Sequence, residues 1–318
     1  MPTDLYPVWE RLKINRHSPD YLEFSYYLEA NLASLATELD NGTYHHGPYR
    51  VRRVTDKKSR ILHIALPRDR LIHRYLYDIL VSRLDHRFDP DVYSARVNKG
   101  LDRALLRAQF LLSKYPDAHI FRSDVAKFFD HVDHQLLLRL LSYHLEPNLL
   151  NLAREIINSF QTSPGRGLPL GNLTSQIFAN LYLHEFDFYL RHQLKPLAYL
   201  RYGDDFMFFF STRRTTQNAA AETIYFLENT LKLTLNARNT AIFSSSSPAY
   251  FLGHHITPVS ITTDPHTCAR LCPKVNFRNL PCYKALRLPS RLRCRLPYLA
   301  IENDPTLSQI LTFYPYRP

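Results

Sequence analysis

Two adjacent carboxylates, Asp204 and Asp205, stand between apolar runs at 197–202 and 206–210. Both runs are rich in residues that fit a half-buried strand, and Gly203 permits the tight turn that would join them as a hairpin. That turn would place two anions at the rim of an apolar sheet, where uncompensated charge is costly. Because such oxygen ligands favour Mg²⁺ over softer metals, the residues predict a cation site. A solvated hairpin tip is the alternative, since Gly and Asp are ordinary turn residues.

A third carboxylate, Asp124, ends the apolar stretch 119–124, far upstream of the aspartate pair. Three acidic residues at the ends of neighbouring strands could hold two metal ions roughly 4 Å apart, the arrangement that clamps the attacking and leaving oxygens in nucleotidyl transfer. Phosphoryl transfer asks the protein mainly for this positioning and charge neutralisation. A single Asp at a strand end is also a common turn former or helix cap, so the prediction depends on the three residues meeting in space.

The segment between these carboxylates, 165–183, has a first half set by Gly and Pro and a second half with apolar residues at helical spacing. This pattern predicts a loop that opens a helix. A Gly-bearing loop at a helix start aims free N–H groups at anions. On these residues alone, an ordinary loop and core helix is the alternative.

Together the three segments resemble, in order and spacing, the motifs of reverse transcriptases. Segment 124–130 is similar to the first catalytic-aspartate motif, 168–183 to the template and nucleotide motif, and 202–205 to the Tyr-x-Asp-Asp box. Within that superfamily, 170–176 is most similar to the enzymes of diversity-generating retroelements, which carry Ser-Gln where group II intron and retron enzymes usually carry Ser-Pro.

Flanking segments extend the resemblance over residues 18–256. The segments 58–60, 67–70 and 94–100 are similar to fingers motifs of the same group, and 251–253 resembles the primer-grip turn. Each piece is weak alone, whereas the joint pattern is specific.

The resemblance implies roles for the acidic residues. Asp124, Asp204 and Asp205 would be catalytic and would hold two Mg²⁺ ions, with the Val125 carbonyl as a further ligand. One ion would activate the primer 3′-hydroxyl, and the other would steady the triphosphate and its leaving group.

The resemblance also implies substrate contacts. An aromatic ring at Phe129 would block a ribose 2′-hydroxyl, so deoxynucleotides would be preferred, although the neighbouring Phe128 could be the exposed ring instead. Arg is suited to bidentate phosphate geometry, yet for each basic candidate a solvated surface role is the alternative. The nucleotide-binding candidates are Lys58, Arg60, Arg68, Phe129, Leu170, Gly171 and Gln176, and the primer-grip candidates are Phe251, Leu252 and Gly253.

Three positions depart from the family pattern. Leu170 stands where many relatives have a Gln that touches the incoming sugar, and an aliphatic side chain cannot make that hydrogen bond. In the diversity-generating group this position goes with error-prone copying, so we expect low fidelity. Asn239 stands where a Lys, a proposed proton donor to pyrophosphate, is usual, and Arg238 or water would substitute. Gly203 is commoner in RNA-dependent RNA polymerases.

The resemblance implies an α+β fold: a right-hand polymerase with fingers, a palm in which helices flank an antiparallel sheet, and a short atypical proline-rich thumb or tail. The mixture of predicted strands and helices favours the same class. We expect an N-terminal helix and fingers at 1–115, a palm with the aspartates and primer-grip turn at 116–256, and a divergent basic thumb or tail at 257–318.

Local patterns predict the individual elements. A helix opens at Ser18-Pro19 and stops at Gly42. A hairpin is predicted at 49–66, and palm strands at 117–124, 197–202 and 206–211. The predicted helices cover 18–41, 68–88, 99–114, 133–145, 148–161, 174–194 and 215–232.

Composition agrees with a nucleic-acid partner. The formal net charge is +11, and basic surface recruits polyanions. Only eight glycines occur. Gly100, Gly171, Gly203 and Gly253 lie inside the motifs, and Gly167 directly precedes one. Because the sequence has no run of about 18 apolar residues and no N-terminal signal, we expect a soluble, cytoplasmic protein with no membrane contact.

The last sixty residues are the least similar to the family. Prolines at 265, 273, 281, 289, 297 and 305 stand at a spacing of eight, and nine Lys or Arg outnumber three Asp or Glu from residue 257 onward. Proline in a helix interior costs about 3 kcal/mol, so no helix here should exceed about two turns. A mobile basic arm that grips a primer-template or an accessory protein is one interpretation, and an extension without a specific role is the other.

All four cysteines, Cys268, Cys272, Cys282 and Cys294, lie in this tail without a CxxC pair. Free thiols are therefore favoured over a zinc site. Two histidines after the first aspartate motif, His131 and His134, are expected to be solvated or to act as caps.

The function predicted from the sequence is an RNA-directed DNA polymerase of a diversity-generating retroelement, with two Mg²⁺ ions as cofactors. Its implied partners are an RNA template, a DNA or RNA primer and dNTPs, and a basic accessory protein is a further candidate. Within the family the alternative is a defence-associated or retron enzyme. Outside it, Gly203 and Asp130 favour an RNA-dependent RNA polymerase, and Asn239 is compatible with a nucleic-acid-binding scaffold that has lost catalysis.

Overall fold

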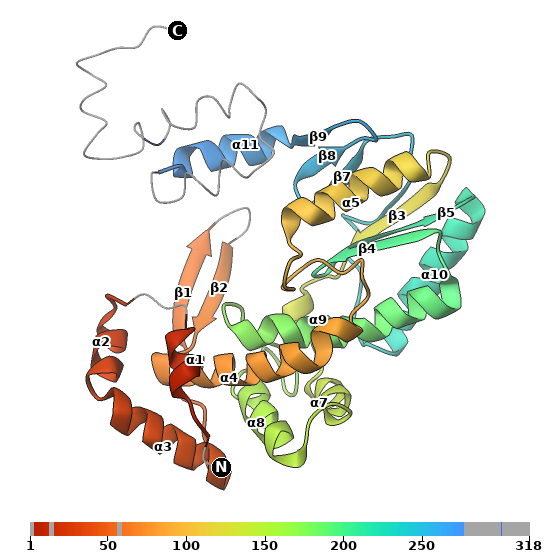
Figure 1. Ribbon diagram of the computed structural model, residues 1–318. Helices are drawn as coiled ribbons and strands as arrows, with labels where there is room; N and C mark the ends of the chain where they lie inside the picture. The colour runs from red at the N-terminus through yellow and green to blue at the C-terminus, as the bar shows by residue number, and fades with distance from the viewer. Residues whose placement is uncertain (1–2, 13–15, 56–58, 277–299, 301–318) are drawn as a thin grey trace, which may run out of the picture.

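The structure is a computed structural model of the 318-residue chain and describes residues 3–12, 16–55, 59–276 and 300. The described part is α+β, as predicted, with fingers on one side and a palm on the other (Figure 1). The helices are α1 (Tyr6–Glu10), α2 (Pro19–Tyr26), α3 (Leu28–Asn41), α4 (Pro67–Leu84), α5 (Leu101–Lys114), α6 (Phe128–His131), α7 (His134–Ser142), α8 (Pro147–Asn158), α9 (Leu173–Tyr189), α10 (Arg213–Asn229) and α11 (Pro265–Leu271).

The described strands form three antiparallel sheets, in the orders β1-β2, β4-β5-β3-β6 and β7-β8-β9. Short turns of other helix types follow α4 at Asp85–Arg87, α9 at Leu190–Leu194 and α11 at Cys272–Lys274. The strands are β1 (Arg50–Thr55), β2 (Ser59–Ile64), β3 (His119–Asp124), β4 (Ala198–Tyr202), β5 (Asp205–Phe210), β6 (Ala241–Ser244), β7 (Ala249–Phe251), β8 (His254–Ile256) and β9 (Ile261–Thr263).

The four-stranded sheet is the centre of the palm, and helices cover both of its faces. Successive residues of a strand point to opposite faces. On one face Phe121 and Phe208 pack in a core that includes Phe186 of α9. On the other face Met207 packs in a second core with residues of α5 and with Phe251 of β7. Both cores hold the sheet rigidly, so the ends of its strands have fixed positions.

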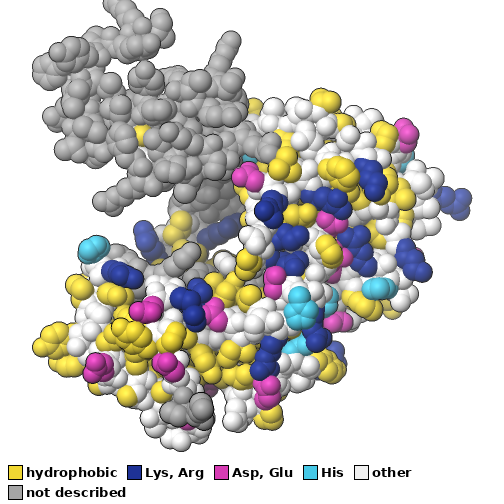
Figure 2. Space-filling view, in the orientation of Figure 1, with side chains coloured by type: hydrophobic (Ala, Val, Ile, Leu, Met, Phe, Trp, Pro, Cys, Tyr) yellow, Lys and Arg dark blue, Asp and Glu magenta, His cyan; other side chains and the backbone are white. Residues whose placement is uncertain are grey.

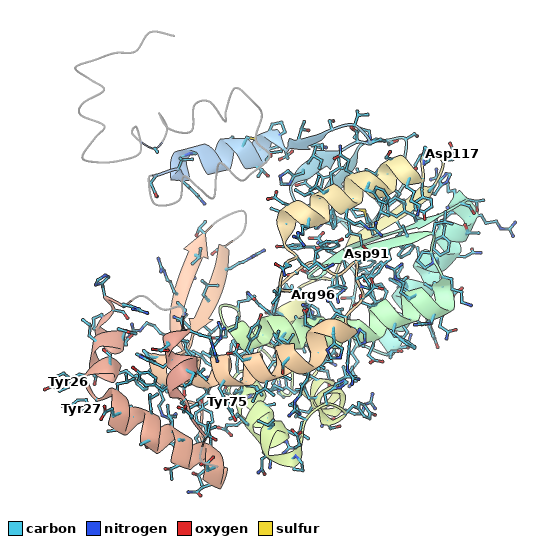
Figure 3. The ribbon with its side chains drawn as sticks, in the orientation of Figure 1. Tyr26, Tyr27, Tyr75, Asp91, Arg96 and Asp117 are labelled. Carbon is cyan, nitrogen blue, oxygen red and sulfur yellow. The ribbon has the colours of Figure 1, made fainter. Side chains whose placement is uncertain are left out.

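The fingers contain the β1-β2 hairpin and α4, which packs against α9. The single helix predicted for 18–41 is wrong, because the chain breaks at Tyr27 into α2 and α3. There Asn31 donates from its side chain to the Phe24 carbonyl at 2.9 Å, which satisfies a carbonyl at the end of α2 without continuing the helix. Tyr26 and Tyr27 project from this break (Figure 3). The predicted stop at Gly42 is confirmed, with φ 67° in the C-cap.

The described start of the tail contains α11, which has seven residues and so stays within the predicted two turns. Cys268 is partly buried, and its Sγ lies 3.7 Å from the Thr263 carbonyl. Cys282, Cys294 and the later prolines of the period-eight pattern lie outside the described residues. In the part of the chain that is described, no helix has the length and apolar character needed to cross a membrane.

Candidate active site

The aspartate pair lies where the chain turns between β4 and β5. Tyr202 pairs with Asp205 across the hairpin, so Gly203 and Asp204 form a two-residue turn. Gly203 has φ 65°, a left-handed conformation that glycine adopts without a steric penalty. Glycine at the first position of such a turn also suits the twist of the flanking strands. Asp204 therefore lies in the turn itself, and Asp205 begins β5.

Asp124 ends β3 directly opposite Asp205. The antiparallel register pairs His119 with Phe210 at one end and Asp124 with Asp205 at the other. Opposite residues in such a ladder have Cα atoms roughly 4.5–5.5 Å apart and side chains on one face. The structure thus brings the three carboxylates to the same end of the palm sheet.

Burial and mutual repulsion favour the protonated form of the aspartate pair. Burial first, and then the charge of Asp204, raises the pKa of Asp205 to about 6, while Arg122 acts in the opposite direction. Burial and then the charge of Asp124 also raise the pKa of Asp204. A carboxylate is disfavoured by neighbours of its own charge unless a cation compensates, so the end of the sheet is electrostatically suited to bind cations.

Arg122 is a residue of this site that the sequence analysis missed. Its Nη2 lies 3.4 Å from Asp205 Oδ1, and its guanidinium carbon lies 5.2 Å from the centre of the Tyr250 ring on β7. Its Nε is buried without a hydrogen-bond partner among the described residues. Strand parity could have found it, because a residue two places before Asp124 shares that residue's face.

Asp124 is fixed by the segment after α10. Asn236 donates from its side chain to Asp124 Oδ2 at 3.3 Å and from its backbone to the Asp124 carbonyl at 2.9 Å. The adjacent bridge between Val125 and Leu235 uses the Asp124 carbonyl and the Ala126 N–H, so it leaves the Val125 carbonyl for other contacts. Asp124 Oδ1 is buried and has no hydrogen-bond partner in the described part of the chain.

These donors fit a divalent cation of the hard type. Carboxylate and carbonyl oxygens are the ligands that Mg²⁺ prefers, and the unsatisfied Asp124 Oδ1 and the raised pKa values of Asp204 and Asp205 both leave room for positive charge. Within residues 3–12, 16–55, 59–276 and 300, no three or more His, Cys, Asp or Glu side chains are gathered closely enough to enclose a metal ion. The carboxylates would therefore have to converge when a cation binds.

The two phenylalanines after Asp124 differ in exposure. Phe128 is 2% exposed and packs in the core, with its ring 6.3 Å from that of Tyr182. Phe129 is only partly buried, and its carbonyl accepts from the Leu168 N–H at 2.7 Å. Of the two rings, Phe129 is therefore the one that a ligand could reach.

The loop before α9 is held by the fingers hairpin. The Leu170 carbonyl accepts from the His63 N–H at 2.8 Å, which leaves the half-exposed Leu170 side chain outside the backbone contact. Gly171 has φ 110°, and an added Cβ would lie 3.6 Å from Leu62 Cβ, so the backbone angle is the stricter demand for glycine. Gln176 is exposed in the first turn of α9.

The three basic nucleotide candidates have different positions. Arg60 lies exposed on β2, and its charge lowers the pKa of Asp204, so the structure places it within electrostatic reach of the turn. Arg68 instead pairs with Glu38 and with Asp69, the latter at 3.1 Å. Those carboxylates already neutralise it at the base of the fingers, so these contacts do not support a triphosphate role for Arg68. Lys58 lies outside the described residues.

The expected primer-grip turn joins β7 to β8. Phe251 pairs with His254, so Leu252 and Gly253 form the turn, with φ 52° and 80°. Two left-handed residues are typical of a type I′ hairpin. Phe251 is buried in the same core as Met207, on the sheet face that also carries Asp205. The turn is therefore anchored to the face of the sheet that carries the carboxylates.

The prediction of a solvated or capping His134 is wrong. Its side chain is 5% exposed, its Nε2 lies 2.7 Å from the Gly167 carbonyl, and its N–H donates to the Gly165 carbonyl at 2.9 Å. The loop before α9 folds back onto this segment, which the local sequence does not reveal. A Cβ at Gly167 would come within 2.6 Å of Thr162 Oγ1, so the close approach requires glycine.

Comparison with known sequences finds relatives over most of the chain. Residues 53–256 match the family described as "Reverse transcriptase (RNA-dependent DNA polymerase)". Protein YkfC of Escherichia coli K12 is 26% identical over 275 residues, which cover 72% of each chain. The group II intron-encoded protein LtrA of Lactococcus lactis is 23% identical over 303 residues, which cover 72% of this chain and 50% of LtrA.

Solved structures of low identity share the fold. Telomerase of Candida albicans, in complex with a TWJ fragment of telomeric RNA, has a TM-score of 0.55 at 12% identity and covers 93% of this chain. Apo telomerase of Candida tropicalis has a TM-score of 0.52 at 13% identity and covers 91%. The match spans 60% and 64% of those telomerase chains, as it spans half of LtrA.

Proposed function

This chain belongs to the reverse transcriptase (RNA-dependent DNA polymerase) family, and from that premise we propose that it copies an RNA template into DNA by two-metal nucleotidyl transfer. The observation that carries the proposal is the register of the palm sheet. It sets Asp124 opposite Asp205 and beside Asp204, where their charges disfavour one another. Such a group gains most when divalent cations arrive with a nucleotide.

The residues divide the work as follows. Asp124 and Asp204 would hold the metal ions with the Val125 carbonyl, and Asp205, which pairs with Arg122, would complete the negative site. Bound Mg²⁺ would activate the primer 3′-hydroxyl and neutralise charge on the leaving pyrophosphate. Asn236 keeps one oxygen of Asp124 engaged, which leaves the other, Oδ1, for a ligand.

In this proposal, substrate selection depends on Phe129 on one side of the nucleotide and on the loop before α9 and β2 on the other. We assign the partly buried ring of Phe129 to exclusion of a 2′-hydroxyl, which favours dNTPs over rNTPs. Gly171 and Gln176 lie on the loop and helix start where a template base would rest, and Arg60 lies on the fingers side, where a triphosphate would need a cation. Leu252 and Gly253 would meet the primer. The substrates of this proposal are an RNA template, a DNA or RNA primer and dNTPs.

The finer proposal is error-prone copying within a diversity-generating retroelement. Its support is the Ser175-Gln176 pair and the aliphatic Leu170. β2 holds the Leu170 backbone. The identity of the side chain at residue 170 can therefore change its contact with a ligand without moving the loop. A retron-like or defence-associated enzyme is the alternative within the family, and a basic accessory protein remains a candidate partner.

Primer extension on a primed RNA template tests the polymerase. With Mg²⁺ and dNTPs the full chain should extend the primer, and Asp124→Asn should not. Extension with rNTPs in preference to dNTPs would instead identify an RNA-dependent RNA polymerase, the alternative that Gly203 suggests. Binding of the primer-template without extension under either condition would identify a scaffold.

Fidelity tests the finer proposal. Leu170→Gln restores an amide that can bond to the incoming sugar, so misincorporation opposite template adenines should fall by roughly tenfold, the equivalent of one hydrogen bond. Sequencing of cDNA from one RNA template by the parent and the variant measures this. Leu170→Met, which keeps the position aliphatic, is the matched control. Equal error rates for the parent and Leu170→Gln would contradict the proposal.

A further inference from the structure

A fully buried arginine stands behind the turn that carries Asp204. Arg201 lies on β4 and is 0% exposed, and its partner Asp187 on α9 is 1% exposed. Arg201 donates from Nε and Nη2 to the two oxygens of Asp187 at 2.7 and 2.6 Å, and Tyr199 donates to the same carboxylate at 2.5 Å. This bidentate pair neutralises both buried charges. The remaining nitrogen, Nη1, is available for hydrogen bonds to other groups.

That nitrogen reaches the catalytic turn. Arg201 Nη1 donates to the Gly203 carbonyl at 2.9 Å, which belongs to the peptide group that precedes Asp204. Because a peptide group is planar, the bond also fixes the direction of the Asp204 N–H. The guanidinium therefore orients the backbone on which a metal-binding carboxylate depends.

Asn180 extends the contact to the fingers side. Its Oδ1 accepts from Arg201 Nη1 at 3.2 Å, and its Nδ2 donates to the Ser94 carbonyl at 2.9 Å. Ser94 continues the loop that borders β4, in which Asp91 and Tyr93 pair with the Arg201 backbone. Asp91 and Arg96 mark this loop in Figure 3. An amide is needed at residue 180, since one end must accept and the other donate.

We propose that Asn180 is a positioning residue for Asp204, because it couples the Ser94 loop to the Gly203 carbonyl through the Arg201 guanidinium. Asp187 alone neutralises Arg201, so Asn180 is not required to keep that buried charge paired. Asn180 instead orients the guanidinium, because its bond to Nη1 holds that nitrogen between the Gly203 carbonyl and the Ser94 loop. The inference rests on the proposed polymerase function and adds a residue that touches neither substrate nor metal.

Two substitutions separate the contacts of Asn180. Asn180→Ala removes both. Asn180→Asp keeps an acceptor for Arg201 and loses the donor to Ser94. The matched control is Thr216→Val, since Thr216 is equally buried and bonds to the Thr212 and His119 carbonyls, at the end of β3 away from Asp124. Each variant is made in the full chain and compared with the parent.

Single-turnover incorporation of one dNTP on a primed RNA template gives the maximal rate and the dNTP dissociation constant, and thermal unfolding gives Tm. Both Asn180 variants should lose roughly 10–100-fold in maximal rate, as partners behind metal ligands do, with the dissociation constant within about threefold. Thr216→Val should lower Tm by a few degrees and leave the maximal rate unchanged.

The outcomes are distinguishable. If the parent incorporates dNTPs and Asn180→Ala matches Thr216→Val, with a lower Tm alone, the positioning role is overturned. A parental rate for Asn180→Asp would overturn the coupling to Ser94. If the parent itself incorporates nothing, the proposed function fails, and this inference fails with it.

Discussion

The two sides of the Gly203–Asp204 turn treat charge in opposite ways. On the α9 side, Arg201 and Asp187 are buried and satisfy each other through a bidentate pair. On the open side, burial and then the charge of Asp124 raise the pKa of Asp204, and burial and then the charges of Asp204 and Asp124 raise the pKa of Asp205. Gly203, whose carbonyl accepts from Arg201, thus lies between buried charges that are fully paired and carboxylates whose charge is not fully neutralised.

This difference separates the structural part of the site from the part reserved for a ligand. A buried charge without a partner would destabilise the fold, so the α9 side has to be complete before any substrate binds. The open side has too little positive charge for its three carboxylates, and the metal ions that accompany a nucleotide would supply it. Figure 2 shows Lys and Arg side chains around the hollow between the fingers and the palm, where an anionic substrate would lie.

The largest expected effect comes from removal of a charge on the open side. Asp204→Asn should lower primer extension by at least about 10³-fold, because a metal ligand supplies several kcal/mol of stabilisation to the transition state. The same variant should unfold at a higher temperature than the parent in EDTA, since it removes a carboxylate that burial and Asp124 disfavour. Extension assays and calorimetry on one preparation measure both. A lower Tm for Asp204→Asn than for the parent would contradict the conclusion that the carboxylates of the open side are under-compensated.

The open side could be predicted from the sequence largely because its residues follow local rules. The apolar runs that end at Asp124 and flank Gly203 show where the strands begin and end. The alternation of faces along a strand then brings Asp124 and Asp205 to the same face. Arg122 was also within reach of that rule, but a lone Arg in an apolar strand was not singled out. The short strand β6, at Ala241–Ser244, was missed because four residues give little periodicity.

The α9 side could not be predicted in the same way. Arg201, Asp187 and Asn180 are ordinary residues in their own segments, and nothing local shows that they meet. Their contact depends on how α9 packs against β4, which is a tertiary event. The burial of His134 has the same origin, since the loop before α9 covers it. The break at Tyr27 is local by contrast, because Asn31 bonds to the Phe24 carbonyl across it.

The second effect breaks the compensated side. Arg201→Met should destabilise the fold by about 3–5 kcal/mol, because it leaves the Asp187 carboxylate buried and unpaired. The double variant Arg201→Met/Asp187→Leu removes that charge as well and should recover most of the stability. It should not recover primer extension, since the Gly203 carbonyl still lacks its donor. Urea unfolding and extension assays measure the two effects.

Recovery of both stability and extension in the double variant would show that the α9 side serves folding alone. Recovery of neither would show that packing around residue 201, rather than charge, holds the turn. The first result would limit the α9 side to a role in folding, and the second would replace charge by packing as what holds the turn.

The smallest effect concerns pH and sharpens the description of the open side. The folded chain keeps a proton on Asp205 up to about pH 6, whereas an unfolded Asp releases it near 3.9. The stability that this proton contributes is therefore complete below the unfolded pKa and lost as pH rises through 6. Asp205→Asn cannot lose it, so without metal ions the variant should gain on the parent between pH 4 and 7, by on the order of 1–3 kcal/mol.

Urea unfolding at pH 4.5 and 7.5 in EDTA measures this gain, and Asp117→Asn is the control. Asp117 is an exposed carboxylate at the far end of the palm from the catalytic turn (Figure 3), so its removal should change stability equally at both pH values. If Asp205→Asn also changed stability equally at both, Arg122 would already neutralise Asp205 fully. The open side would then hold only two uncompensated carboxylates, Asp124 and Asp204, and metal binding would have to rest on those two.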